Sequence, residues 1–304
     1  MKTEQTAVRP QSLKKGDLIA ICSPAGPVKE EYVREAAAVL EKEGWRVKIM
    51  PHTLGKNGHF SGTDQERYSD LKAVLTDPEV KAVLCSRGGY GVVHIMDDIA
   101  RLPIASEPKW LIGYSDISAL HALLSTKGVQ SLHASMASHI KLGPENEDNA
   151  ALFSILRGEN PVYTFPSHEY DRFGIVSGIV RGGNMAVIAE LINTPYDVLQ
   201  PDTILFIEDI AEPIYKVERI LYQLRLSGVL PRLKGLIVGQ FTDYKPDDNY
   251  KDMETMIRDM VAPYSYPVAF GAPIGHVFHN IPMIESARIT LKVSPSGTTS
   301  IIYW

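Results

Sequence analysis

The run KWLIGYSDIS, residues 109–118, sets a serine between an apolar strand and a helix. Residues 110–114 are apolar enough for a buried strand, and a helical pattern runs from Asp116 to about Ser125. A tight strand-to-helix turn of this kind lifts a hydroxyl above the edge of a sheet. Ser115 is therefore a candidate nucleophile. An ordinary helix N-cap stays open as the alternative, because the run lacks the second glycine of the usual G-x-S-x-G pattern.

The same alternation of strand and helix occupies the first half of the chain. Apolar runs at 17–23, 45–50 and 81–85 indicate strands, and helical periodicity covers 29–43 and resumes after Thr63. This rhythm predicts a parallel sheet with helices on both faces. Such sheets collect their functional groups at the carboxyl ends of the strands, which is where Ser115 stands.

A change of composition divides the chain. Polar runs interrupt the alternation between residues 142 and 172, and beyond them strands and helices are mixed. We therefore expect a nucleophile-bearing α/β domain at 1–150, a linker at 151–172 and a smaller C-terminal domain at 173–304.

Composition excludes several classes of protein. The chain has 304 residues, 44% hydrophobic and 22% charged, which is typical of a soluble globular protein. Its net charge of −5, without a dense Lys/Arg cluster, argues against nucleic-acid binding. No apolar run could span a membrane and the first ten residues lack a secretory core, so we expect a cytoplasmic location. Cys22 and Cys85, both in strand-like runs, are expected to be buried thiols, and no metal site is predicted.

A glycine-rich loop, Arg87-Gly88-Gly89-Tyr90-Gly91, follows the predicted strand at 81–85. Paired glycines let backbone N–H groups turn toward a ligand, so the loop could donate to an oxyanion or cradle a phosphate. A plain turn explains the same residues equally well. The spacing matches neither the P-loop nor the dinucleotide-binding pattern.

An acid and a histidine stand at two further strand ends. Glu208 follows the apolar run 204–207 and could orient a histidine, although a solvated strand end and the neighbouring Asp209 remain alternatives. His276 lies in a loop after a strand and suits the role of general base. His279 and His133 are its rivals.

With these residues in view, the chain resembles the LD-carboxypeptidases of peptidase family S66. The resemblance covers nearly the whole chain, and several motifs recur in the right order. The matched segments are residues 16–25, 58–67, 86–91, 113–120, 181–184 and 205–209, followed by Gly275-His276 with Asn280.

The resemblance implies a catalytic triad of Ser115, His276 and Glu208. It also implies an oxyanion hole formed by the N–H groups of Asp116 and Gly89, the latter preferred over Gly88. A flavodoxin-like N-terminal domain, a smaller β-rich C-terminal domain, a homodimer and the absence of any cofactor belong to the same expectation. Two segments depart from the family pattern: 133–136 reads His-Ala-Ser-Met where His-Gly-Pro-Met is usual, and Val277 replaces the glycine that usually follows the histidine.

The implied reaction is release of the terminal D-alanine from a murein tetrapeptide in peptidoglycan recycling. An exopeptidase must bind a free carboxylate, for which Arg87 and Arg219 are candidates, with Gly88 and Tyr90 beside the former. A solvated surface charge is the simpler interpretation of Arg219. Two other functions remain open: a hydrolase of the same family that confers immunity to a peptide-nucleotide antibiotic, and a binding protein without catalysis.

Overall fold

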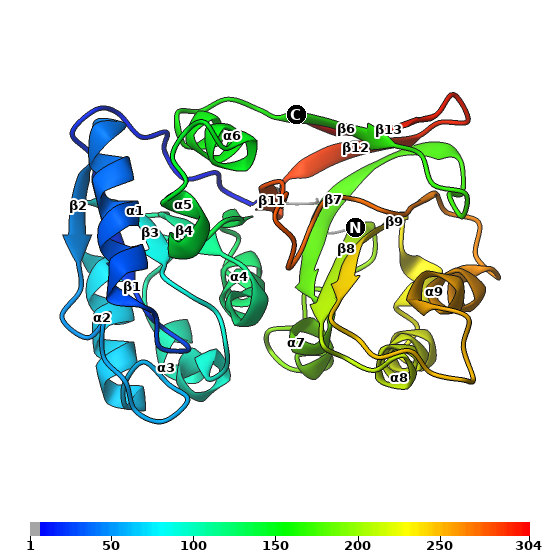
Figure 1. Cartoon of the computed structure of the whole chain (residues 1–304), viewed down its shortest axis with the longest axis horizontal. Coiled ribbons are helices and arrows are strands. Elements are labelled where there is room, and N and C mark those ends of the chain that lie inside the picture. The colour runs from blue at the N-terminus through cyan, green and yellow to red at the C-terminus, as the bar shows by residue number, and fades with distance from the viewer. Residues whose placement is uncertain (1–6) are drawn as a thin grey trace. The chain divides into compact units, whose positions relative to one another are not determined.

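Two sheets organise residues 7–304, the part of the chain that the computed structural model describes (Figure 1). The described chain separates into two units. The first holds residues up to Glu159 and, from late in the sequence, Ile281–Ser286. The second holds Asn160–Asn280 and Ala287–Trp304.

The sheet of the first unit is parallel except at one edge. Its order is β2-β1-β3-β4-β5, with β11 antiparallel to β5. This order is that of flavodoxin-like folds, so the expected fold class of the N-terminal half is confirmed. The strands are β1 (Leu18–Cys22), β2 (Arg46–Ile49), β3 (Val80–Cys85), β4 (Trp110–Gly113), β5 (Ser131–His133) and β11 (Met283–Glu285).

Helices of the first unit follow from apolar periodicity and capping. The helix at Glu30–Lys42 buries Val33, Ala36, Ala37 and Leu40, which recur at helical spacing on one face. The helix that follows Thr63 begins with a capping box, because Thr63 and Glu66 each accept the other's backbone N–H. The helices are α1 (Glu30–Lys42), α2 (Asp64–Thr76), η1 (Val92–Ile95), α3 (Met96–Ala100), η2 (Ser115–Ile117), α4 (Ser118–Thr126), α5 (Ala137–Ile140) and α6 (Glu147–Leu156).

The two cysteines lie side by side in the first sheet. Cys22 and Cys85 pair across β1 and β3, and both are buried and free. The hydrogen bond to Cys85 and burial raise the pKa of the Cys22 thiol. The expectation of buried thiols is therefore confirmed.

The second unit is built on a mixed sheet of order β10-β9-β8-β7-β12-β13-β6. The strands from β10 to β7 are parallel and those from β7 to β6 are antiparallel, as the predicted β-rich domain requires. The strands are β6 (Val162–Pro166), β7 (Gly174–Asn184), β8 (Thr203–Ile210), β9 (Gly235–Thr242), β10 (Val268–Ala269), β12 (Arg288–Val293) and β13 (Thr298–Tyr303). The helices are α7 (Met185–Glu190), α8 (Ile214–Leu226), η3 (Leu230–Arg232) and α9 (Met253–Val261).

Residues 151–172, expected to form a linker, instead contain the end of α6 and the whole of β6. Asn146 caps α6 by accepting the N–H of Asn149, so this polar run starts a helix. The strand β6 lies at the edge of its sheet, and its exposed positions account for the polar composition.

The expected C-terminal domain at 173–304 is also interrupted, because β11 within it pairs with β5 of the first unit. Residues 182–184 continue β7, although a run of two glycines and an asparagine is also typical of a turn. Gly182 pairs with Phe206, and a Cβ at Gly182 would lie 1.9 Å from the Phe206 carbonyl oxygen. Glycine there permits close strand pairing.

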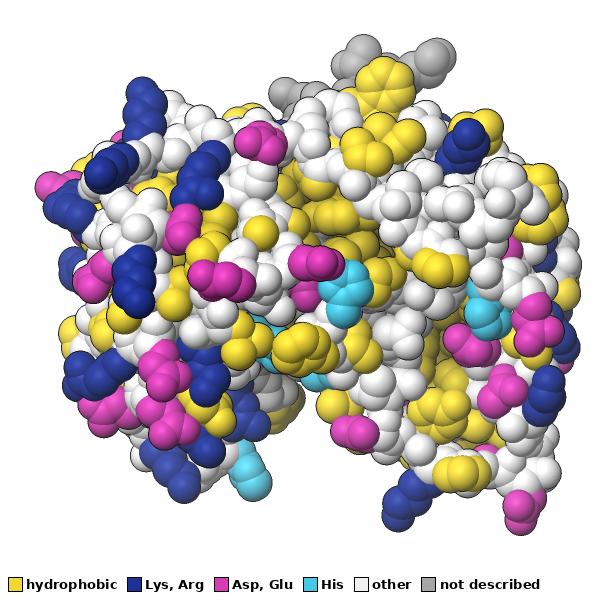
Figure 2. Space-filling model, turned by 45° about the horizontal axis from the view of Figure 1, so that its top comes forward, with side chains coloured by type: hydrophobic (Ala, Val, Ile, Leu, Met, Phe, Trp, Pro, Cys, Tyr) yellow, Lys and Arg dark blue, Asp and Glu magenta, His cyan; other side chains and the backbone are white. Residues whose placement is uncertain are grey.

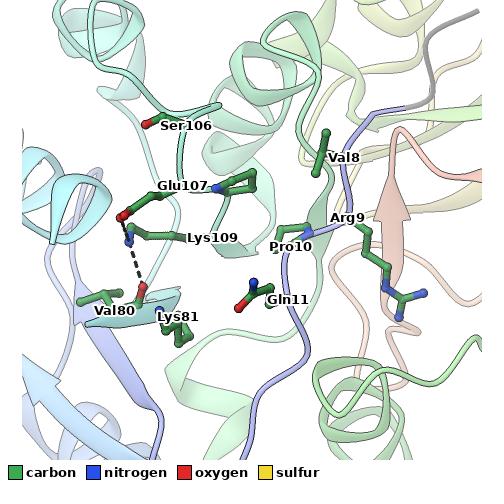
Figure 3. A pocket seen from close by; sticks show the side chains of 10 residues that line it. Val8, Arg9, Pro10, Gln11, Val80, Lys81, Ser106, Glu107 and Lys109 are labelled. Atoms are coloured by element: carbon green, nitrogen blue, oxygen red, sulfur yellow. Dashed lines mark hydrogen bonds and ion pairs between the residues drawn. The ribbon is translucent and has the colours of Figure 1, made fainter. Parts of the chain in front are cut away.

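A pocket of about 300 Å³ opens at the amino ends of β3 and β4 (Figure 3). The buried ammonium of Lys109 donates to the carbonyl oxygens of Asp77 and Val80 beside it, and burial lowers the Lys109 pKa. Ser115 follows the opposite, carboxyl end of β4, so this pocket is separate from the candidate nucleophile. The pocket is lined by residues 8–11, 80, 81 and 106–109.

Candidate active site

Ser115 occupies a strained turn. It follows β4 and opens η2, with a φ of +68°. A positive φ is uncommon for residues other than glycine, and such strain often marks functional turns. The turn presents the Ser115 hydroxyl at the carboxyl end of the sheet, as a nucleophile elbow does.

The glycine loop presses against this turn. A Cβ added to Gly88 would lie 2.8 Å from the Cβ of Ser115 and 3.0 Å from its Oγ. Gly89 has a φ of +121°, and a Cβ there would lie 3.2 Å from the Cα of Gly26. Only glycines let the loop after β3 approach the serine and the loop after β1 so closely.

Two backbone amides beside Ser115 have no acceptor. Within residues 7–304, no hydrogen bond is made by the N–H of Gly89 or by that of Asp116. Asp116 is the second residue of η2, and the first amides of a helix lack partners inside it. Unpaired donors of this kind are what an oxyanion hole requires.

Glu208 and His276 form a hydrogen-bonded pair in the second unit. His276 Nδ1 lies 2.8 Å from Oε2 of Glu208, whose side chain is fully buried on β8. An ionised carboxylate only accepts, so Nδ1 carries the proton and the basic lone pair is on Nε2. This tautomer suits a general base.

A glycine and an asparagine shape the loop that carries His276. Gly275 has a φ of +122°, and a Cβ there would lie 2.8 Å from the Cβ of Glu208. The buried Asn280 accepts the Gly275 N–H through Oδ1 at 2.9 Å. Sequence reasoning noticed Asn280 only within the family pattern and did not see that it closes this loop.

Asp209, the rival of Glu208, has a different task. Its carboxylate accepts from the Asn184 side chain at 2.8 Å and from the Ala186 N–H at 2.9 Å, which fixes the start of α7. Burial raises the pKa of Asp209 to about 6. Of these two carboxylates, Glu208 forms the hydrogen bond to His276 Nδ1, and Asp209 holds the start of α7.

The two rivals of His276 lie in different surroundings. The ring of His133 is buried at the end of β5, 5.8 Å from that of Tyr114 and 6.4 Å from that of His121. His279 is exposed in the loop beyond His276.

The candidate carboxylate-binding residues are exposed. Arg87 donates to the Pro27 carbonyl at 2.8 Å beside the glycine loop, and Tyr90 of that loop is half exposed. Arg219 lies on α8 in the second unit, 5.6 Å over the ring of Tyr215. Arg87 therefore shares a unit with Ser115, and Arg219 shares one with the Glu208–His276 pair.

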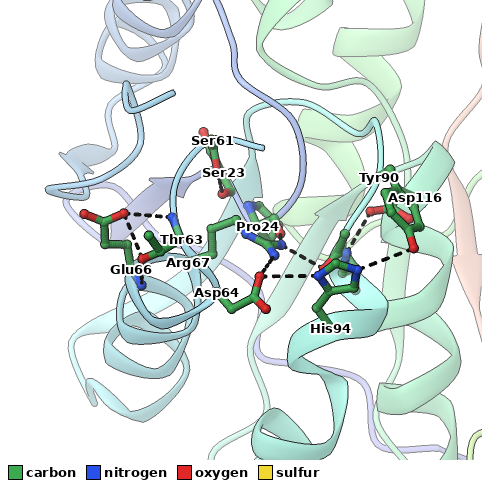
Figure 4. A network of polar contacts seen from close by, with 12 residues as sticks. Ser23, Pro24, Ser61, Thr63, Asp64, Glu66, Arg67, Tyr90, His94 and Asp116 are labelled. Atoms are coloured by element: carbon green, nitrogen blue, oxygen red, sulfur yellow. Dashed lines mark hydrogen bonds and ion pairs between the residues drawn. The ribbon is translucent and has the colours of Figure 1, made fainter. Parts of the chain in front are cut away.

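Buried polar side chains around the elbow escaped sequence reasoning (Figure 4). The Asp116 carboxylate accepts the Val92 N–H at 3.0 Å, and burial raises its pKa. Arg67 is fully buried and donates to the Gly91 carbonyl at 2.8 Å. A signal for Arg67 was present: it precedes Leu71 by four positions on the inner face of α2, where a charge is costly unless paired.

Comparison with known proteins gives the family. The LD-carboxypeptidase N-terminal domain matches residues 19–134, and the LD-carboxypeptidase C-terminal domain matches 177–291. The chain belongs to the LD-carboxypeptidase family, peptidase S66. The expected family and its hydrolase class are thereby confirmed.

Relatives in this family extend over most of the chain. A Bacillus subtilis protein named "Probable murein peptide carboxypeptidase" is 31% identical over 94% of this chain and 92% of its own. The murein tetrapeptide carboxypeptidase of Pseudomonas aeruginosa is 30% identical over 86% and 89%. Each match therefore spans most of this chain and most of the relative.

Solved structures share the fold. The muramoyltetrapeptide carboxypeptidase of Oxalobacter formigenes is 29% identical, with a TM-score of 0.84 over 94% of this chain and 98% of that one. MccF in complex with glutamyl sulfamoyl guanosine has a TM-score of 0.83 over 98% of each chain, at 19% identity. The second likeness supports the fold alone.

Proposed function

We propose that this protein is a serine-type LD-carboxypeptidase that removes the terminal D-alanine from murein tetrapeptide. The observation that carries the proposal is the strained Ser115 turn with two unpaired amides beside it. The Glu208–His276 hydrogen bond supplies the base that a serine nucleophile needs. The names of the relatives from Pseudomonas and Oxalobacter supply the substrate class.

The first half of the reaction acylates Ser115. His276 Nε2 takes the hydroxyl proton while Oγ attacks the carbonyl carbon of the diamino acid. Glu208 stabilises the imidazolium, and the amides of Gly89 and Asp116 hold the oxyanion. The imidazolium then protonates the leaving nitrogen, the C–N bond breaks and D-alanine departs.

The second half releases the product. Water gives a proton to His276 Nε2 and its oxygen attacks the ester on Ser115. The amides of Gly89 and Asp116 also hold this second oxyanion. The proton then passes from His276 Nε2 to Ser115 Oγ as the ester bond breaks. The tripeptide leaves with a new carboxylate, and the enzyme is restored.

The decisive experiment is a time course of D-alanine release from purified murein tetrapeptide. We expect wild type and Ser106→Ala, an exposed-serine control, to release D-alanine, whereas Ser115→Ala loses about a million-fold in turnover. Near-normal hydrolysis by Ser115→Ala would remove the nucleophile assignment. Cleavage of an aminoacyl sulfamoyl nucleoside together with inactivity on the tetrapeptide would instead favour antibiotic immunity.

We further infer a cytoplasmic homodimer that binds neither nucleic acid nor membrane. Two buried free thiols fit a reducing compartment, and basic and acidic side chains are interspersed on the face drawn in Figure 2. Within residues 7–304 no helix is both long and apolar enough to cross a bilayer. Light scattering at micromolar concentration tests the dimer, and cell fractionation tests the location.

A further inference from the structure

The glycine loop and its two flanking residues, 86–92, are held in their first part by backbone hydrogen bonds. The Ser86 N–H donates to the Cys22 carbonyl at 2.8 Å. The Gly88 carbonyl accepts the Gly26 N–H at 3.0 Å. These bonds hold the first part of the loop against the segment after β1.

Two buried charged side chains hold the rest. Arg67 is 1% exposed and its Nη1 donates to the carbonyl oxygens of Gly91 and Pro24, at 2.8 and 2.5 Å. Asp116 is 5% exposed and its Oδ2 accepts the N–H of Val92 at 3.0 Å. Arg67 thus bonds the carbonyl of Gly91, and Asp116 bonds the N–H of the next residue, Val92 (Figure 4).

Asp116 connects the two proposed donors of the oxyanion hole. Its own N–H is one of them, and its carboxylate reaches the loop that carries the other, on Gly89. The distance between the donors is therefore set in part by one side chain. Catalysis by such donors depends on position, since a misplacement of about 1 Å can cost a hundredfold in rate.

The Arg67 side chain is itself held rigidly. Its Nη2 bonds Asp64 at 2.5 Å, and its guanidinium lies 5.1 Å over the ring of Phe60. The planar guanidinium serves the two carbonyls through Nη1 and the Asp64 carboxylate through Nη2 at fixed positions, which a lysine ammonium does less well. A cation is costly to bury, and here the Asp64 carboxylate and the carbonyl oxygens of Pro24 and Gly91 compensate that cost.

We propose that Arg67 and Asp116 are positioning residues, which hold the glycine loop where its Gly89 amide and that of Asp116 receive the oxyanion formed on Ser115. The inference rests on the proposed serine chemistry. Neither side chain acts on the substrate. Each acts through the backbone, so its loss affects the rate of acylation more than the binding of the ground state.

The test compares Asp116→Ala, Asp116→Asn and Arg67→Lys with wild type. Asp98→Ala and Arg101→Lys are matched controls, because Asp98 and Arg101 form an exposed ion pair in the same unit. We expect Asp116→Ala and Arg67→Lys to lower kcat for the tetrapeptide about 10- to 100-fold with little change in KM. Asp116→Asn keeps an acceptor oxygen for Val92 and should retain most of the activity.

A second readout covers variants that fold poorly. Protein that is misfolded and does not refold during the assay lowers the amplitude of labelling by a fluorophosphonate and leaves the rate constant for Ser115 unchanged. We expect this rate constant to fall in parallel with kcat. Unchanged rate constants in Asp116→Ala and Arg67→Lys, or equal losses in the two controls, would overturn the proposal.

The same experiment separates this inference from the proposed function. A wild type that labels at Ser115 but spares the tetrapeptide contradicts the proposed substrate, and the labelling rates of the variants still decide the positioning role. A wild type that is not labelled at Ser115 and does not hydrolyse the tetrapeptide contradicts both the proposed function and the positioning role, because no oxyanion then forms on Ser115.

Discussion

The hydrogen bond from His276 to Glu208 decides which imidazole nitrogen can act as a base. The buried Glu208 carboxylate accepts the hydrogen bond from Nδ1–H, and in the proposed mechanism it stabilises the imidazolium that forms during attack. Asp209, the next residue of β8, accepts the Ala186 N–H at the start of α7. Adjacent carboxylates of one strand thus have separate roles, and substitutions that remove only charge can tell them apart.

Glu208→Gln should lower kcat by about a thousandfold or more, because a glutamine amide can stabilise the wrong tautomer of His276. Asp209→Asn should instead lower stability and leave kcat of the folded enzyme nearly unchanged. D-alanine release and thermal unfolding measure the two effects. Equal losses of kcat in both variants would contradict the assignment.

Arg87→Ala should raise KM for the tetrapeptide about tenfold or more, since a charge-assisted contact to the terminal carboxylate is lost. Its effect should be much smaller on a substrate whose terminus is an amide. Arg219→Ala serves as the control and should change neither constant. The proposal for Arg87 fails when acid and amide substrates respond equally.

Among the elements, β4, β5 and α4 meet at a buried histidine. His121 Nε2 donates to the Gly113 carbonyl at 2.8 Å, and its Nδ1 accepts from the Ser131 hydroxyl at 2.8 Å. Burial lowers the His121 pKa to about 4. The imidazole thus stays neutral in the folded protein at a pH where it charges in the unfolded chain.

This difference predicts acid sensitivity. Between pH 6.5 and about 4 the unfolded state binds the His121 proton and the folded state does not, so stability falls as the pH is lowered, by up to about 3 kcal/mol. His121→Gln, which can donate and accept in the same way, should lose less stability on acidification. Urea unfolding at pH 4.5 and pH 7 measures this, with the exposed His59→Gln as control. A pH dependence identical to wild type in His121→Gln would contradict the prediction.

Elements with strong periodicity were predictable and short ones were not. Strands β1, β3 and β4 are visible in the sequence as apolar runs. The start of α2 is indicated by the capping-box residues Thr63 and Glu66. By contrast β5 and β11 have three residues each, too few to show a period. The side-chain roles of Arg67 and Asp116 depend on loops brought together by the sheet, which local sequence does not encode.

On the scale of the whole molecule, β11 returns the chain to the first unit. Ile284 is fully buried and pairs with Leu132 of β5. Ile284→Asp should therefore weaken amide protection in β5, far away in sequence, because it buries an unpaired charge. Hydrogen exchange at 131–133 measures this, and Ile175→Asp at an exposed position is the control. Unchanged exchange in Ile284→Asp would contradict the pairing.

The division into units also explains what sequence could say about the site. The proposed nucleophile was predicted from its strand-to-helix run, and the proposed base and acid from strand ends. Their assignment as one triad came from the family pattern, because residues of different units have no local relation in sequence. The boundary expected near residue 150 did not account for residues 281–286, which belong to the first unit. A polar loop indicates where one unit ends, but it does not indicate that a later segment rejoins that unit.

The stretch of chain between His276 and β11 is also short. Only seven peptide steps separate His276 from Met283, which pairs with His133, the neighbour of Gly113 in the sheet. A chain of that length reaches about 25 Å at most. Only residues 277–282 lie between His276 and β11, so this link between the two units is short. A single proteolytic cut between 277 and 282 would sever it without removing any side chain of the proposed triad.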